Sequence, residues 1–216
     1  MGKGGGIVTR MCAGVLVCQL LSVVLSATMR ITGGQARGIT LVTPKGDATR
    51  PATDGMREAV FSSLGPRVNE AHFLDLFAGS GAYGLEALSR GASSGTWVER
   101  NGRAAGCIKK NIAAVGKSLR RELIDSNVVM ADALTLPWSK PMLPDLVFID
   151  PPYDIIPEVH ERLFSGLAKL LAAHPDPWIV FEMPGEIELA PEGWELVKRL
   201  GKGARQPSVR FYRRAT

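Results

Sequence analysis

Four residues of the types needed for chemistry on an amine stand together at Asp150, Pro151, Pro152 and Tyr153, directly after an apolar run. Two consecutive prolines end a strand, because they cannot donate to its hydrogen-bond ladder. The amine of a nucleic-acid base is a weak nucleophile, and acceptors that bind both of its N–H groups favour its attack on an electrophile. The Asp150 carboxylate and the Pro151 carbonyl are two such acceptors, and Tyr153 offers a ring on which a base stacks. This segment, the DPPY loop, therefore indicates a catalytic site for an exocyclic amine.

Upstream, Gly79, Gly81 and Gly84 spell G-x-G-x-x-G directly after an apolar run that contains Asp75. Such a turn lets the backbone approach a ligand and aims helix N-terminal N–H groups at it, which suits a dinucleotide or an adenosyl cofactor. A carboxylate at Asp75 would repel a pyrophosphate but would bind the ammonium group of methionine. The loop therefore favours S-adenosylmethionine, and the predicted contacts are Asp75, Phe77, Gly79, Ser80 and Gly81.

Two further acidic residues lie at the ends of predicted strands. Glu99 lies about 20 residues beyond the glycines, where a carboxylate accepts from ribose hydroxyls. Asp132 follows the third strand and is predicted to accept from the adenine amine of the cofactor. Either residue alone is equally well explained as a helix cap, and the DPPY loop alone as a rigid turn. Their combination with Asp75 and the glycines favours a cofactor cleft beside a catalytic loop.

Short apolar runs alternate with helical patterns after Met29, which predicts an α/β fold with a mainly parallel sheet. The predicted strands are 72–77, 95–99, 127–131, 145–149 and 178–182. A basic, Gly-containing loop between 194–200 and 208–214 predicts an antiparallel hairpin that closes the sheet. A helix is expected from Asp54, with this residue as its N-cap and with inward side chains at Met56, Val60, Phe61 and Leu64.

The 216-residue chain is expected to divide at Met29. The run from Met11 to Leu25 is almost wholly apolar and resembles a secretory signal peptide, although it is short for a membrane span. Export would separate the protein from the cofactor and substrate that the motifs above indicate. We therefore interpret residues 1–28 as an N-terminal extension or as the result of a start codon assigned too far upstream. Residues 29–216 are predicted to form one catalytic domain, with 29–65 as an N-terminal lobe.

Composition bounds the partners and the chemistry. The net charge of +5 favours anionic partners, and the basic residues of the C-terminal hairpin either grip phosphates or keep an edge strand from aggregating. The cysteines Cys12, Cys18 and Cys107 are scattered, and the histidines lack ligand spacing, so we expect no disulfide framework, no metal and a reducing cytoplasm. Methylation at a pyrimidine ring carbon needs a cysteine nucleophile, and the DPPY loop contains none.

Five segments together carry a resemblance to a known family: MRITGG at 29–34, TRPATD at 49–54, LDLFAGSG at 74–81, GLEALSRGA at 84–92 and DPPY at 150–153. The chain resembles the bacterial RsmD-type 16S ribosomal RNA guanine-N2 methyltransferases over nearly everything after Met29. The resemblance implies a class I S-adenosylmethionine methyltransferase (Rossmann-like) fold, with a seven-stranded, mostly parallel sheet, an antiparallel C-terminal hairpin and helices on both faces. It also implies methylation of one guanine N2 amine in small-subunit ribosomal RNA.

Carried over by position, the resemblance implies that Asp75, Gly79, Gly81, Glu99 and Asp132 bind the cofactor and that residues 150–153 hold the target amine. Thr53, Asp54 and Arg57 match the family's N-terminal motif, whose helix either borders the cofactor or RNA or is simply a capped surface helix. A monomer that acts on 16S ribosomal RNA, presented by a small-subunit assembly, is the expected working state.

Several alternatives stay open at this point. Amino methylation of DNA adenine or cytosine, or of protein glutamine, would use the same loop. A nicotinamide-dependent oxidoreductase is compatible with the glycines but leaves Asp75 and the DPPY loop without a task. A non-catalytic RNA-binding protein would not need Asp150.

Overall fold

The computed structural model describes residues 1, 29–44, 53–136, 143–204 and 206–215. Over these residues the chain forms a single seven-stranded sheet in the order β3-β2-β1-β4-β5-β7-β6. Its strands are β1 (His72–Leu76), β2 (Ser94–Val98), β3 (Ser126–Val129), β4 (Leu146–Ile149), β5 (Trp178–Pro184), β6 (Trp194–Leu200) and β7 (Pro207–Arg214). Each predicted strand is confirmed, with ends that shift by one or two residues.

Strand direction brings the chemically interesting loops to one edge of the sheet. β1 pairs in parallel with β2 and β4, and β4 pairs in parallel with β5. β7 runs antiparallel to both β5 and β6, so the predicted hairpin is present and its second strand inserts between β5 and the first. Because the parallel strands end at the same edge, the glycine loop after β1 lies beside the DPPY loop after β4.

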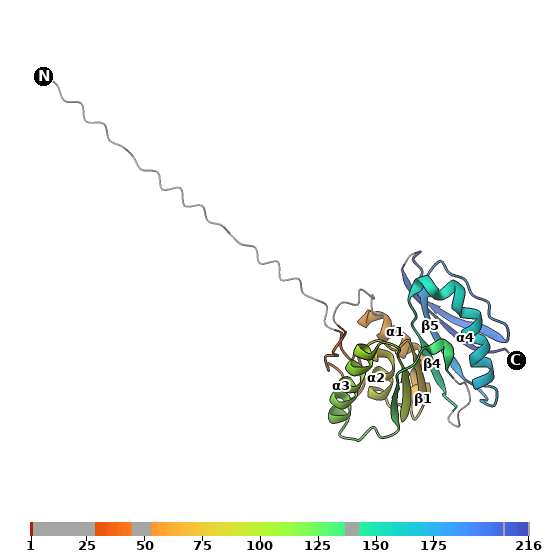
Figure 1. Cartoon of the computed structure of the whole chain (residues 1–216), viewed down its shortest axis with the longest axis horizontal. Coiled ribbons are helices and arrows are strands. Elements are labelled where there is room, and N and C mark those ends of the chain that lie inside the picture. The colour runs from red at the N-terminus through yellow and green to blue at the C-terminus, as the bar shows by residue number, and fades with distance from the viewer. Residues whose placement is uncertain (2–28, 45–52, 137–142, 205, 216) are drawn as a thin grey trace.

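Helices cover both faces of this sheet, as expected, and the alternation of side chains along each strand separates two cores. On one face Phe73, Trp97 and Phe148 pack with α1 (Asp54–Leu64), α2 (Ala82–Ser89) and α3 (Gly102–Leu119). On the other face Val147 and Ile149 pack with α4 (Ile156–Leu170). Figure 1 shows α2 and α3 on one side of the strands and α4 on the other. Short 3-10 turns complete the fold: η1 (Gly65–Val68), η2 (Ala133–Thr135) and η3 (Tyr153–Ile155).

The start of α1 differs from the prediction in one respect. Thr53, not Asp54, is the N-cap, and its side chain accepts from the backbone N of Met56 at 3.2 Å. Asp54 stands in the first turn, where its carboxylate pairs with Arg30 and Arg57 instead of with the helix backbone. Threonine caps here because the aspartate is drawn into this ion-pair cluster. Val60, Phe61 and Leu64 are buried as predicted, whereas Met56 is only half-buried.

The segment 29–44 runs across the same core as α1. Ile31 and Leu41 are buried in the cluster that contains Phe61 and Phe148, and an antiparallel bridge joins Arg30 to Thr40. The apolar run 11–25 lies outside the described residues, so the division at Met29 stays a prediction. Within the described part of the chain, no helix has the length and apolar character to cross a membrane.

Gly84 allows α2 to pack directly on the sheet. A Cβ atom at this position would collide with the rings of Phe73 and Trp97. We therefore expect Gly84→Ala to lower the free energy of unfolding by about 1–3 kcal/mol, since a packed core accommodates an added methyl poorly. Urea unfolding measures the change. Gly106→Ala on α3, where a Cβ would meet nothing within 4 Å, is the matched control and should stabilise by up to about 1 kcal/mol. Equal effects at the two positions would contradict this account.

Candidate active site

The turn after β1 is built from left-handed backbone. Phe77, Gly79 and Gly81 have φ values of 58°, 54° and 81°. This conformation is open to glycine but costs a phenylalanine about 1 kcal/mol, a strain that concentrates at functional loops. A Cβ at Gly79 would meet nothing within 4 Å, so the space above this residue is open to a ligand, whereas a Cβ at Gly81 would lie 3.1 Å from the Trp97 indole nitrogen. The turn thus presents bare backbone on its outer side.

Asp75 sits beneath this turn on β1 and is buried. Its Oδ2 accepts from the backbone N of Gly84 at 3.0 Å, inside the first turn of α2. Burial, and then the charge of Glu99, raise the pKa of Asp75 to about 8, although the Gly84 hydrogen bond works against the shift. Among the residues that the structure describes, no basic side chain pairs with Asp75, and an incoming ammonium group would supply that positive charge.

Glu99 connects the glycine turn to α3. Its Oε2 accepts from the backbone N of Gly79 at 2.8 Å, and its Oε1 accepts from the backbone N of Asn101 at 2.7 Å. Asn101, not Glu99, is the N-cap of α3, because its side chain accepts from the backbone N of Arg103 and Ala104. A carboxylate offers four acceptor directions, so Glu99 retains capacity for two hydroxyl groups.

The other two predicted cofactor contacts are placed differently. Asp132 follows β3 and caps η2, where its Oδ1 accepts from the backbone N of Leu134 at 2.8 Å. Ser80 is buried, and its hydroxyl donates to the sulfur of Met29 while its carbonyl accepts from Asn111. The cap role of Asp132 is therefore present in the structure, and Ser80 offers a ligand no exposed hydroxyl.

Three carboxylates line one face of the sheet at this edge. In the strand register, Asp75 pairs with Phe148 on β4, and Phe148 pairs with Val180 on β5. Two residues farther along these strands, the same register places Asp150 beside Glu182. Burial, followed by the charges of Glu182 and Asp75, raises the pKa of Asp150 well above its ordinary value. Such a perturbed group at the ligand-binding edge is typical of a catalytic position.

The remainder of the DPPY loop is a short, rigid exit from β4. Pro151 is buried, Pro152 is exposed and is the N-cap residue of η3, and Tyr153 is half-buried. The Tyr153 hydroxyl donates to Oε1 of Glu182 at 3.3 Å. The four predicted residues therefore stay together beside the glycine turn, with one aromatic ring partly open to solvent.

Glu182 and Tyr83 were missed by the sequence analysis. Glu182 is 1% exposed on β5, and its Oε2 accepts from the Tyr83 hydroxyl of α2 at 2.8 Å. The only available signal was a single acidic residue inside an otherwise apolar strand, a type that is almost never buried without partners.

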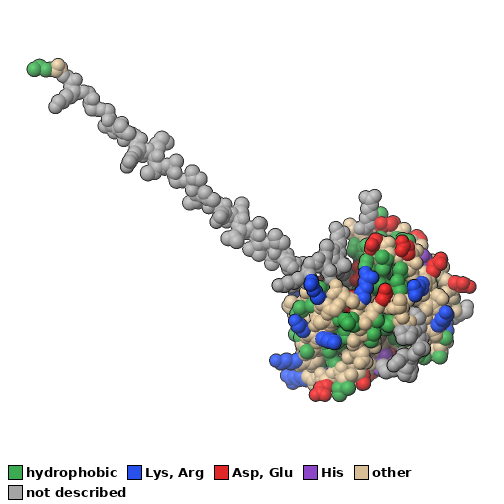
Figure 2. Space-filling view, in the orientation of Figure 1, with side chains coloured by type: hydrophobic (Ala, Val, Ile, Leu, Met, Phe, Trp, Pro, Cys, Tyr) green, Lys and Arg blue, Asp and Glu red, His purple; other side chains and the backbone are tan. Residues whose placement is uncertain are grey.

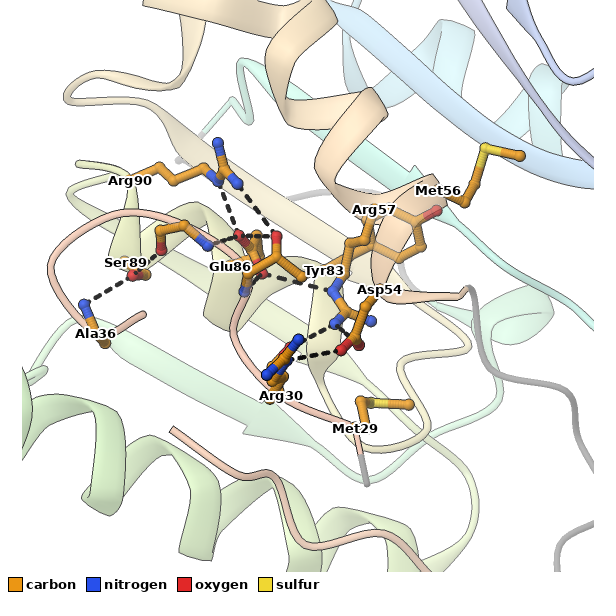
Figure 3. Close-up of polar contacts among 12 residues, drawn as sticks. Met29, Arg30, Ala36, Asp54, Met56, Arg57, Tyr83, Glu86, Ser89 and Arg90 are labelled. Carbon is orange, nitrogen blue, oxygen red and sulfur yellow. Dashed lines mark hydrogen bonds and ion pairs between the residues drawn. The ribbon is translucent and has the colours of Figure 1, made fainter. Parts of the chain in front are cut away.

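Behind these groups, the N-terminal motif forms a buried ion-pair cluster. Arg57 and Glu86 have fully buried side chains whose charged atoms are 3.5 Å apart. Glu86 also accepts from the backbone N of Thr32 and Gly33 and from Arg90 Nε, each at 2.8 Å. Figure 3 shows Glu86 between Arg57 and Arg90, with Tyr83 beside Arg57. The motif helix is thus more than a capped surface helix, since it borders the Tyr83 side of the site.

Basic side chains of the C-terminal hairpin and of α3 have different surroundings. Arg199, Arg210, Arg213 and Arg214 of the hairpin donate to carbonyl or carboxylate oxygens of the chain itself. In contrast, α3 carries four basic residues and no acidic one, and all four are exposed: Arg103, Lys109, Lys110 and Lys117. Figure 2 shows blue side chains on the side where Figure 1 places α3. The described residues contain no cluster of three or more metal-ligating side chains.

Known proteins match this chain over most of its length. The family described as Conserved hypothetical protein 95 matches residues 29–213. Ribosomal RNA small subunit methyltransferase D of Escherichia coli is 34% identical over 191 residues, which cover 88% of this chain and 91% of that protein. The chain belongs to the RsmD family.

Solved structures extend the likeness to the fold of the RsmD family. An Escherichia coli structure provisionally described as methyltransferase yhhF has a TM-score of 0.68 at 34% identity, and covers 87% of this chain and 98% of that one. SMU.776, a provisionally assigned methyltransferase solved with S-adenosylhomocysteine, has a TM-score of 0.59 at 12% identity over 75% of this chain and 49% of that one. The seven-stranded sheet with its inserted antiparallel strand is the class I, Rossmann-like methyltransferase fold.

Proposed function

We propose that this chain is an S-adenosylmethionine-dependent methyltransferase that methylates the exocyclic N2 amine of a guanine in 16S ribosomal RNA. The observation that carries the proposal is the position of Asp150 and the Pro151 carbonyl at the end of β4, one strand away from the glycine turn of β1. The relative named Ribosomal RNA small subunit methyltransferase D supports the RNA substrate.

The residues around the glycine turn fit the proposed cofactor. Asp75 is a buried carboxyl with no basic partner in the described part of the chain, Gly79 leaves open space above the backbone, and Glu99 retains free acceptor directions. We assign Asp75 to the methionine ammonium and Glu99 to the ribose, while Asp132 stays a proposed partner of the adenine edge. When bound, S-adenosylmethionine supplies a methyl group on a positively charged sulfur, which is already an activated electrophile.

The DPPY loop provides what a weak nucleophile needs. Asp150 and the Pro151 carbonyl accept from the two N–H groups of the target amine, which localises its lone pair on nitrogen. One N–C bond forms as the methyl–sulfur bond breaks, and the amine then sheds one proton. The raised pKa of Asp150 makes its carboxylate a good acceptor for that proton. Tyr153 is assigned to stack on the base, which replaces about 1–3 kcal/mol of the stacking lost when the base leaves its neighbours.

The direct test is transfer of a tritiated methyl group to naked 16S RNA, small ribosomal subunits, DNA and protein, followed by nucleoside analysis of the labelled product. We expect N2-methylguanosine from the RNA or from the subunits. Label on adenosine, cytosine or glutamine would show that the proposed substrate is wrong but that the reaction is still an amino methylation. Absence of transfer to every substrate would overturn the proposal.

Asp75 predicts a pH dependence of cofactor binding. With a pKa of about 8 it is mostly protonated at pH 7, and an arriving ammonium favours the ionised form, so binding should release up to about one proton. Affinity for S-adenosylhomocysteine should therefore rise by up to about tenfold per pH unit between pH 6 and 8 and level off above. Titration calorimetry in buffers of different ionisation enthalpy measures the proton count. Asp75→Asn should bind more weakly with no proton release, and a pH-independent affinity of the unaltered protein would contradict the assignment.

The setting of the reaction is part of the proposal. A monomer in the reducing cytoplasm would meet its target within a small-subunit assembly, where the exposed basic face of α3 can contact RNA phosphates.

A further inference from the structure

Glu182 lies where two tyrosines from different parts of the fold converge. Its two carboxylate oxygens accept separately, Oε2 from Tyr83 of α2 at 2.8 Å and Oε1 from Tyr153 of η3 at 3.3 Å. These are two of the three tyrosines in the chain. A glutamate buried to this degree costs several kcal/mol in lost hydration, so burial alone gives the protein no stability benefit.

The surroundings of Glu182 keep its charge available. Burial raises the pKa of Glu182, whereas the hydroxyls of Tyr83 and Tyr153 and the positive charge of Arg57 lower it. Arg57 comes from α1, Tyr83 from α2 and Tyr153 from the DPPY loop, so three separate parts of the fold contribute a group that acts on this carboxylate. The same residue faces Asp150, which in turn faces Asp75.

The register of the sheet connects this carboxylate to the reacting loop. β4 and β5 pair up to Ile149 and Phe181, and the next residues are Asp150 and Glu182. Tyr153 is separated from Asp150 only by two prolines, whose rings restrict the backbone between them. A contact that holds the Tyr153 hydroxyl in place therefore also restrains the position of residues 150–153.

We propose that Glu182 is a positioning residue for methyl transfer: anchored by Tyr83, it holds Tyr153 and thereby positions the DPPY loop. After burial, the negative charge of Glu182 is the next cause of the raised pKa of the neighbouring Asp150. The inference rests on the proposed function and adds to it the residue that orders the target-base side of the site. A mere structural brace would hold the loop but would leave the titration of Asp150 unchanged.

The test compares Glu182→Gln, Tyr153→Phe and their combination in steady-state methylation of the RNA substrate between pH 5.5 and 9. Glu182→Gln should lower kcat by about 10- to 100-fold, because small displacements of a reacting group carry losses of this size. Affinity for S-adenosylhomocysteine should stay within about twofold. The acid limb of the pH profile should move to lower pH, because removal of a neighbouring negative charge lowers the pKa of Asp150. The double variant should lose little more than Glu182→Gln alone, since both act through one contact.

Two further variants make the result decisive. Tyr83→Phe removes only the hydroxyl that anchors Glu182 and should also lower kcat. This variant tests the same contact if Glu182→Gln folds poorly. Tyr212→Phe removes the hydroxyl of the third tyrosine, which is buried on β7 and donates to the Leu189 carbonyl, and should leave kcat unchanged. A wild-type kcat for Glu182→Gln, or a lower kcat with an unmoved acid limb, overturns the inference. An inactive wild-type protein overturns the proposed function instead.

Discussion

Replacement of Asp150 with alanine is expected to lower kcat for RNA methylation by about 10²- to 10⁴-fold, the range found when a positioned acid–base or charge-stabilising group is removed. In the proposed mechanism the carboxylate is the acceptor that localises the amine lone pair and receives its proton, and the Pro151 carbonyl cannot receive a proton in its place. Affinity for S-adenosylhomocysteine should be nearly unchanged, because the glycine turn, Asp75 and Glu99 stay in place. Single-turnover methylation and titration calorimetry measure the two effects separately.

Asp154→Ala serves as the control, because Asp154 is the exposed acidic neighbour of the DPPY loop. It should retain wild-type kcat. A carboxyl whose pKa is raised on folding stabilises the folded protein fully only below its unfolded pKa, and that benefit is lost as pH rises. Asp150→Ala should consequently be as stable as the wild type, or more stable, at pH 8. An Asp150→Ala protein that is stable and keeps kcat within tenfold would remove this residue from the mechanism.

Loss of Glu86 is expected to have the largest effect on stability. Glu86→Ala leaves the fully buried Arg57 guanidinium without its partner on α2 and leaves the backbone N–H groups of Thr32 and Gly33 without an acceptor. Removal of one member of a buried ion pair lowers the free energy of unfolding by about 3–5 kcal/mol. Urea unfolding at pH 7 measures the change. The segment 29–44 should also become more open to proteolysis, because Glu86 ties it to α2.

Glu58→Ala provides the comparison for that prediction, since Glu58 is an exposed glutamate on α1, one residue from Arg57. Its effect should stay within about 0.5 kcal/mol. A loss below about 1 kcal/mol for Glu86→Ala would mean that Arg57 finds another partner and that the cluster is not a unit.

Local motifs explain why much of the site could be predicted. The strand–turn–helix at 72–89 and the strand–proline break at 146–153 are written in consecutive residues, because glycines permit left-handed backbone and prolines end a strand. The parallel sheet follows from the alternation of short apolar runs with helical patterns. Asp75, Glu99 and Asp150 were therefore expected at one edge of the sheet, and the structure has them at the carboxyl ends of β1, β2 and β4.

Contacts between distant segments could not be predicted in the same way. Thr53 is the N-cap in place of Asp54 because Asp54 forms ion pairs with Arg30 and Arg57. Three arginines of the hairpin donate to backbone carbonyls of neighbouring segments. Each of these contacts depends on which side chain or carbonyl the tertiary fold brings nearby, and the helix or strand propensity of a residue contains no information about that.

The amino-acid sequence by itself determined the fold class, the glycine turn and the proline break of the DPPY loop, since each depends on backbone preferences and side-chain types within about 15 residues. Only the tertiary structure decided that β7 enters between β5 and β6, that Arg57 and Glu86 meet in the interior, and that Glu182 joins Tyr83 to Tyr153. Residues 99 positions apart meet only through strand register and helix packing. Burial away from water lowers the local dielectric constant, so the charge of one carboxylate acts strongly on the next.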